Sequence, residues 1–134
     1  MREKFYHVYG KVKTDDGEEH VVTVVGKLEQ SRKPTEITEE MDVDTPNGGT
    51  VKGELKYKVK KLHRKLTLSM SICHPLDTFD EEVGVEIAKS RIKNGLVLGS
   101  VETNDVTMLT EDAIFAELMT KLNWIMANIE DYLP

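Results

Sequence analysis

Few residues of this chain have the types and spacing that catalysis requires. The single cysteine, Cys73, is followed directly by His74, and neighbours on a strand point to opposite faces, which disfavours a nucleophile–base pair. The four histidines show no metal-ligand spacing, and one cysteine cannot build a structural zinc site. No P-loop, dinucleotide fingerprint or nucleophile elbow is present. We therefore expect a protein that is not an enzyme, with no metal site and no cofactor.

One arrangement keeps catalysis open as an alternative. Asp44, followed by Glu54 and Lys56 on an expected strand, loosely resembles the acidic-residue and Glu-x-Lys layout of metal-dependent nucleases. Such enzymes hold a hard metal ion with the carboxylates and orient the attacking water with the lysine. Any charged strand offers such a triplet by chance, so non-catalytic binding is the leading interpretation.

Residues suited to binding a nucleotide occur between Tyr57 and Thr107. Phosphate is recognised by cations or amides, a base by aromatic or guanidinium planes, and ribose by amides. The candidates on these grounds are Arg64, Phe79, Arg91, Asn94, Asn104 and Thr107, with Tyr57 as a second aromatic group. Structural roles are open for the same residues: an ion pair for Arg91, a core anchor for Phe79, and caps or turns for the asparagines.

The segment from Val51 to Cys73 predicts a β-hairpin. Apolar and polar residues alternate from Val51 to Lys60 and again from Lys65 to Cys73, so a turn at 61–64 would join two strands. In that register the apolar pairs on one face are Val59–Leu66, Tyr57–Leu68 and Leu55–Met70.

The other face of this hairpin is basic. Seven basic residues and one acidic residue between Lys52 and Lys65 give a local charge of +6, in a chain of net charge −6. Such a face can bind a polyanion, or it can be a solvated surface whose lysines discourage edge-to-edge pairing. The first interpretation gives an alternative function, an interaction or nucleic-acid-binding accessory protein that uses hairpin 52–65. The acidic net charge argues against general duplex binding, so nucleic acid is not an expected partner.

The strands that would position these residues begin near the N-terminus. Strands at Phe5–Lys13 and His20–Leu28 flank Thr14-Asp15-Asp16-Gly17, a sequence typical of a tight turn. The segment 30–50 is acidic and rich in proline and glycine, with a turn at 46–49. We expect an exposed excursion there, mobile in part.

Two helices are expected after the strands. Thr78 and Glu81 have the spacing of a capping box for a helix from Phe79 to Asn94, where Asn94-Gly95 is a stop signal. Arg91 falls on the buried side of this helix, and because it cannot lose its charge it needs an anionic or carbonyl partner.

A short strand at Leu96–Val101 is expected before the last helix, which Thr110 caps. This helix has a broad apolar side, expected to be buried, that runs from Ile114, Phe115, Leu118 and Met119 to Leu133. Trp124 points away from that side beside small residues, which favours a subunit interface, with a single solvent-exposed Trp as the alternative.

Length and composition favour one domain over residues 1–134. A single cysteine fits a reducing cytosol. Because the sequence has no long apolar run, we expect no signal peptide and no membrane partner.

The run SICHPLDTFDEEVGVEIAKSRI, residues 71–92, resembles a group of small tailed-phage proteins. The layout of hairpins first and two helices after is similar to the first-described family of phage anti-Thoeris proteins. The resemblance implies a sponge that binds cyclic ADP-ribose signals made by host TIR-domain proteins and holds them without cleavage. It also implies dimers that assemble further, signal pockets between subunits, and a second site for cyclic oligonucleotides in some members.

The resemblance implies a pocket built from aromatic, asparagine and arginine groups. In this sequence these could be Phe79, Asn104, and Arg64 or Arg91. Lys121 stands where the resemblance places a pocket arginine, and a lysine gives up the planar, bidentate phosphate contact.

These observations lead to one expectation for the whole chain. The expected fold is α+β, an antiparallel sheet of four to six strands with two C-terminal helices packed on it, in a homo-oligomer of two or more subunits. The expected function is that of a phage-encoded, non-catalytic protein in the cytoplasm of the bacterial host. It would sequester a cyclic nucleotide immune signal, of the cyclic ADP-ribose type or a cyclic oligonucleotide, and so block anti-phage defence.

Overall fold

The fold is α+β, as the sequence predicts, with one antiparallel sheet in the strand order β1-β2-β3-β4. The computed structural model describes residues 2–74, 78–104 and 108–133. The strands are β1 (Arg2–Lys13), β2 (Glu19–Asp44), β3 (Thr50–Cys73) and β4 (Gly99–Thr103). The helices are α1 (Glu81–Lys93), α2 (Glu111–Ala127) and the single turn α3 (Ile129–Tyr132).

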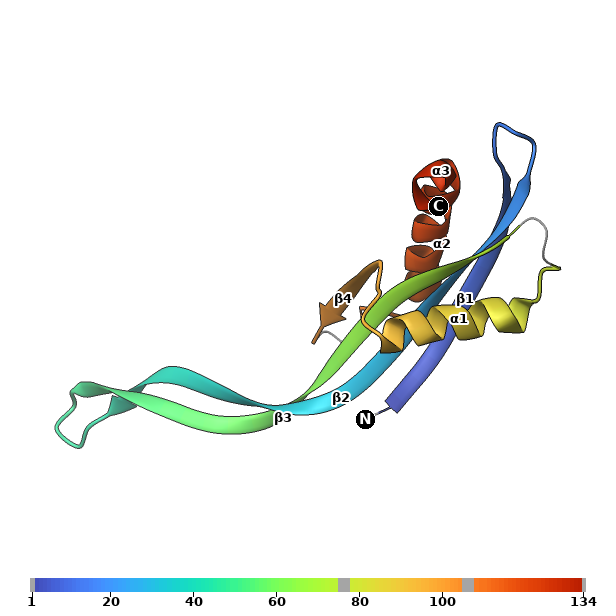
Figure 1. Cartoon of the computed structure of the whole chain (residues 1–134). Helices are drawn as coiled ribbons and strands as arrows, with labels where there is room; N and C mark the ends of the chain where they lie inside the picture. The colour runs from blue at the N-terminus through green and yellow to red at the C-terminus, as the bar shows by residue number, and fades with distance from the viewer. Residues whose placement is uncertain (1, 75–77, 105–107, 134) are drawn as a thin grey trace.

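Strands β2 and β3 are far longer than their neighbours and extend beyond the rest of the protein (Figure 1). β1 pairs with β2 only as far as Gln30, and β4 pairs with β3 only between Arg64 and Leu68. Beyond these points β2 and β3 pair only with each other, down to the pair Asp44 and Thr50. We call residues 31–44 and 50–63 the arm. At about 3.3 Å per residue the arm is roughly 45 Å long.

The predicted hairpin within 51–73 is wrong, because β3 runs through 61–64 without a turn. Val59 lies opposite Thr35, and Tyr57 opposite Ile37, not opposite Leu66 and Leu68. The interruption of the alternation marks a change of face instead. Odd-numbered positions are apolar in the arm, and even-numbered positions are apolar in the body of the sheet.

Both predicted glycine turns are present, and each closes a hairpin. In the β1–β2 turn the Thr14 N–H donates to the Glu18 carbonyl at 2.9 Å. In the β2–β3 turn the Thr45 N–H donates to the Gly49 carbonyl at 2.8 Å. Gly48 has φ +81°, a conformation that glycine adopts without steric cost. Segment 30–50 is largely exposed, as expected, but it forms strand up to Asp44 and then the turn.

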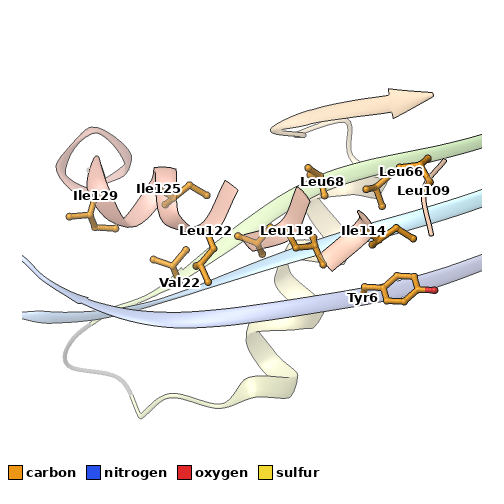
Figure 2. Packing of buried hydrophobic residues seen from close by; sticks show 11 residues of the cluster. Tyr6, Val22, Leu66, Leu68, Leu109, Ile114, Leu118, Leu122, Ile125 and Ile129 are labelled. Atoms are coloured by element: carbon orange, nitrogen blue, oxygen red, sulfur yellow. The ribbon is translucent and has the colours of Figure 1, made fainter. Parts of the chain in front are cut away.

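The helices α1 and α2 cover opposite faces of the sheet. Helix α2 packs on the even-numbered face, and its buried side points at the strands (Figure 2). The largest fully buried side chains of this layer are Val22, Val24, Leu66, Leu68, Ile114, Leu118, Leu122 and Ile125. Helix α1 lies on the odd-numbered face, where Ser71 Oγ–H donates to the Gly84 carbonyl at 2.8 Å.

The helix ends differ from the sequence expectation in detail. Asp80, not Thr78, is the N-cap of α1, because its carboxylate accepts from the N–H groups of Glu82 and Val83 at 3.0 and 3.3 Å. Asn94 is the C-cap and Gly95 follows with φ +78°, as predicted. Thr110 caps α2, as predicted, by accepting from Ala113 N–H at 3.3 Å.

The apolar side of α2 is narrower than the sequence suggests. Phe115 and Met119 are 40% and 44% exposed, whereas Leu118 between them is fully buried. Trp124 is 62% exposed and points outward, as predicted. No helix in the described ranges is both long and apolar enough to span a membrane.

Candidate functional site

A row of polar residues crosses the sheet where the arm begins. Arg2 on β1 lies opposite Gln30 on β2, and Gln30 lies opposite Arg64 on β3. Register partners share a face, so all three side chains belong to the α2 side of the sheet. Since neighbouring strands are about 4.8 Å apart, the two arginines stand roughly 10 Å apart with Gln30 between them.

This row borders a cavity of about 530 Å³, which we call the arm-base cavity. The starts of β1 and α2 form its other walls, with Lys4, Tyr6 and Thr110 among the lining residues. The cavity contains three basic side chains, those of Arg2, Lys4 and Arg64, and two acidic ones, those of Glu3 and Glu111. Its character is therefore polar, with a small excess of positive charge.

Arg64 is the most firmly held cation of the cavity. Its Nε–H donates to Gln30 Oε1 at 3.1 Å, and its Nη1 donates to the Leu109 carbonyl at 3.3 Å. One bond goes to β2 and the other to the connection that precedes α2, and together they use two of the five guanidinium N–H groups. The half-buried guanidinium is thus fixed in orientation at the cavity wall.

The carbonyl that holds Arg64 belongs to a strained residue. Leu109 has φ +55°, which costs a non-glycine residue about 1–2 kcal/mol. It is also buried, at 5% exposure, in the core cluster beneath α2. The core packing of the Leu109 side chain helps to hold the conformation that presents its carbonyl to Arg64.

Lys4 brings a second, more exposed cation to the cavity. Its Nζ lies 5.1 Å from the centre of the Tyr6 ring and 3.4 Å from Glu111 Oε1. Tyr6 first, and then Glu111, raise the pKa of Lys4. Because the pair is exposed to solvent, Glu111 can exchange its place on Lys4 with an anionic ligand at little cost.

A second cavity, of about 310 Å³, lies under the start of α1. Phe79 lines it and contacts Tyr9, with ring centroids 5.3 Å apart and an interplanar angle of 42°. Hydroxyl groups of Thr23 and Ser71 lie at its wall. No lysine or arginine is among the described residues that line it, so this cleft suits an uncharged group better than a phosphate.

The remaining predicted ligand residues do not join Arg64 in one chain. Arg91 donates to the Met70 carbonyl at 2.8 Å, which confirms that it needs a carbonyl or anionic partner. Phe79 lies just before the N-cap of α1, whereas Arg91 lies ten residues beyond Glu81, roughly 15 Å along the helix. Asn94 caps α1, and Lys121 lies half-buried on α2.

Asn104 lies near the base of the arm, directly after the edge strand β4. Its Oδ1 is 2.9 Å from Nδ1 of His63, the residue before Arg64. Thr107 lies outside the described residues. His63 and Arg64 are neighbours on a strand and face opposite sides of the sheet, so the bond to His63 places the Asn104 side chain on the side opposite the arm-base cavity. Phe79 lies in a separate cleft.

Sequence reasoning missed Arg2, Lys4, Gln30 and Leu109 as parts of a site. The predicted four-residue turn at 14–17 would pair Lys13 with Glu18 and Arg2 with Glu29, one residue out of the observed register, in which Arg2 lies opposite Gln30. No sequence signal points to the positive φ of Leu109.

The positive charge of the predicted basic face is offset only in part by β2. Asp42 lies opposite Lys52 and Glu36 opposite Lys58, whereas Lys56 and Lys60 lie opposite the uncharged Thr38 and Pro34. The nuclease candidates Asp44 and Glu54 are four register positions apart, roughly 13 Å. In the described part of the chain no three His, Cys, Asp or Glu side chains group as metal ligands would.

The arm-base cavity thus brings together the positioned Arg64, the cations Arg2 and Lys4, and the side-chain amide of Gln30. No family model, curated protein or solved structure matches this chain. Function is therefore inferred from this cavity, its charges and its position.

Proposed function

We propose that this protein is a non-catalytic binding protein whose arm-base cavity takes the phosphates of a nucleotide-like ligand. The observation that carries the proposal is the Arg64 guanidinium, held by Gln30 and Leu109 at the wall of the cavity. An oriented guanidinium recognises phosphate through paired, charge-assisted hydrogen bonds. Arg2, roughly 10 Å away in the same register row, can meet a second phosphate.

The size of the cavity supports a small molecule. Its volume of about 530 Å³ lies within the range of roughly 300–1,000 Å³ that ligand pockets occupy. A cyclic nucleotide carries its phosphates on one compact ring system, which suits two cations a fixed distance apart. The ligand we favour is such a cyclic nucleotide.

A narrower proposal rests on the resemblance of residues 71–92 to small tailed-phage proteins. In that proposal the protein is encoded by a phage and acts in the bacterial cytoplasm. It holds a cyclic ADP-ribose-type signal or a cyclic oligonucleotide, returns it unchanged, and so keeps the host defence silent. The alternative of a polyanion-binding hairpin has less support, because Asp42 and Glu36 of β2 lie opposite two of its lysines, Lys52 and Lys58.

A thermal-shift screen of the full chain tests the proposal. The ligands are cyclic ADP-ribose isomers, cyclic di- and trinucleotides, and a short single-stranded DNA. A ligand present at 100 times its Kd stabilises the folded state by about 2.7 kcal/mol, which raises Tm by roughly 10 °C for a chain of this size. Ligand recovered after heat denaturation should have its original mass.

Arg64→Lys is the decisive variant, because it keeps the charge but loses the planar fork. We expect the Tm shift to fall by at least half. Arg32→Lys on the exposed arm is the matched control and should leave the shift unchanged. No shift of the wild-type Tm with any cyclic nucleotide would contradict the proposal, and a salt-sensitive shift with DNA alone would favour the polyanion alternative.

A further inference from the structure

An acidic cavity lies at the end of the sheet opposite the arm, between the β1–β2 turn and the last residues of the described chain (Figure 1). We call it the turn cavity. Its volume is about 480 Å³, which is within the range of ligand pockets. The described residues that line it are Thr14, Asp15, Asp16, Glu18, His20, His74, Glu130 and Leu133. Half of them are acidic, and none of them is a lysine or an arginine.

His20 is the buried polar residue of this cavity. Its side chain lines the cavity although the residue is only 5% exposed. Its Nδ1 is a buried polar atom that finds no hydrogen-bond partner among the described residues. A buried polar atom without a partner destabilises the folded state, and native proteins contain few of them. Because the His20 ring lines the turn cavity, a molecule bound there can supply the hydrogen bond.

Asp16 is a fixed negative charge beside His20. Its Oδ1 accepts hydrogen bonds from the Thr14 hydroxyl and, at 3.0 Å, from the Glu18 N–H. The Thr14 bond first, and then the Glu18 bond, lower the pKa of Asp16, and His20 acts in the same direction. The carboxylate is therefore ionised at neutral pH, and the turn holds it in one orientation at the cavity wall.

A second cavity, of about 370 Å³, adjoins the turn cavity, because Thr14, Asp15 and Glu130 line both. It adds one further carboxylate, that of Asp131, and one lysine, Lys13. The apolar side chains that line it are Val12, Met126, Ala127 and Ile129. We call the two cavities together the acidic groove. The groove thus combines several carboxylates with an apolar wall.

The chemistry of the groove suits an organic cation. Ionised carboxylates only accept hydrogen bonds, an imidazole nitrogen without a hydrogen also accepts, and an ammonium group only donates. A divalent metal ion fits less well, because it gathers several ligands around one point. In the described part of the chain no three His, Cys, Asp or Glu side chains converge in that way. A polyamine has ammonium groups spaced along a methylene chain, so it can meet carboxylates spread along a groove and also contact an apolar wall.

We propose that the acidic groove binds a linear aliphatic polyamine. One ammonium group lies between Asp16 and the Nδ1 side of His20, and another lies between Asp15 and Glu130. The site is separate from the arm-base cavity and has the opposite charge. His20 and Gln30 are ten residues apart on β2, roughly 33 Å along the strand. The polyamine proposal therefore stands or fails independently of the nucleotide proposal.

Isothermal titration calorimetry of the full chain with spermidine tests the proposal. We expect saturable binding, and Asp15→Asn with Glu130→Gln should weaken it about 5- to 10-fold, since the pair removes the two carboxylates that line both cavities. The matched control, Asp44→Asn with Glu40→Gln, removes the same charge from the exposed arm and should leave the affinity unchanged. A wild-type chain without saturable binding would overturn the proposal. An equal loss in both double variants would also overturn it, because general electrostatic attraction would then explain the binding.

His20→Leu tests the buried nitrogen. Leucine has a similar volume but offers no acceptor, so the spermidine affinity should fall about 5-fold, the equivalent of one hydrogen bond. Stability against urea without ligand should not fall, because the change removes a polar atom that has no partner among the described residues. Lower stability with unchanged affinity would show that His20 is structural and would contradict its place in the site. Tighter binding of Mg²⁺ than of spermidine to the wild type would overturn the proposal in favour of a metal site.

Discussion

Gln30 and Arg64 are register partners on β2 and β3, and the Gln30 side-chain oxygen accepts the Nε–H of Arg64 at 3.1 Å. The pair stands where the four-stranded sheet ends and the two-stranded arm begins. It therefore fixes the arginine that we assign to phosphate binding in the last row where all four strands are paired.

Gln30→Leu should weaken ligand binding without changing the charge of the cavity. The leucine keeps a similar volume but gives Arg64 no acceptor, so the guanidinium loses one of its two orienting bonds. We expect roughly a 5- to 10-fold rise in Kd, the equivalent of one hydrogen bond of about 1–1.5 kcal/mol. Isothermal titration calorimetry with the cyclic nucleotide from the thermal-shift screen measures it. Equal affinity in the two proteins would show that Gln30 does not position Arg64.

Gly84→Ala should destabilise the contact between α1 and the sheet. A Cβ atom at this position would lie 2.9 Å from Thr23 Oγ1, which is too close for either to remain in place. We expect a loss of about 1–3 kcal/mol in the free energy of unfolding. Thr23→Ala in the same chain should recover part of it. Gly99→Ala, whose added Cβ meets nothing within 4 Å, is the control. Urea unfolding of the wild type, of Gly84→Ala and Thr23→Ala alone and of the double variant gives the coupling energy.

Leu118→Ala should cost far more stability than Met119→Ala. Leu118 is fully buried between α2 and the sheet, whereas Met119 is 44% exposed. Truncation of a buried leucine costs about 2–5 kcal/mol, and an exposed methionine should cost less than about 1 kcal/mol. Denaturant unfolding measures both. Similar losses at the two positions would contradict the packing of α2.

The hydrogen bonds of Asp16 in the β1–β2 turn should stabilise the folded state less at acidic pH than at neutral pH. The Thr14 hydroxyl, followed by the Glu18 N–H, lowers the pKa of Asp16. A carboxyl whose pKa is lowered in the folded state adds stability above its unfolded pKa, near 3.9, and loses it as pH falls through the folded pKa. Asp16→Asn should therefore lower Tm at pH 6 and match the wild type near pH 2. A Tm difference that does not change with pH would contradict the assignment.

Local signals in the sequence predicted much of this fold. The turn at Asp15-Asp16-Gly17, the Thr110 cap and the Asn94-Gly95 stop each depend on a few neighbouring residues, and all three are present. The need of Arg91 for a carbonyl or anion also followed from its place on the helix.

The arm could not be predicted, because its pairing is non-local. Both ends of segment 51–73 alternate correctly, and a strand that changes its apolar face looks the same in sequence as two strands joined by a turn. The absence of glycine, proline, asparagine and aspartate from 61–64 was the available sign that no turn lies there. The site was missed for the same reason. The predicted turn at 61–64 contained Arg64, whereas in the continuous strand β3 Arg64 lies opposite Gln30.

The central claim is that Arg64 binds ligand phosphate in the arm-base cavity, and the NMR signal of its Nε–H group tests it most directly. In ¹⁵N-labelled full chain titrated with the cyclic nucleotide that raises Tm, we expect this signal to show one of the largest shifts. Backbone signals of Lys4 and Thr110 should move with it, whereas those around Phe79 should stay in place. Perturbation confined to the cleft between Phe79 and Tyr9, with the Arg64 signal unchanged, would contradict the account.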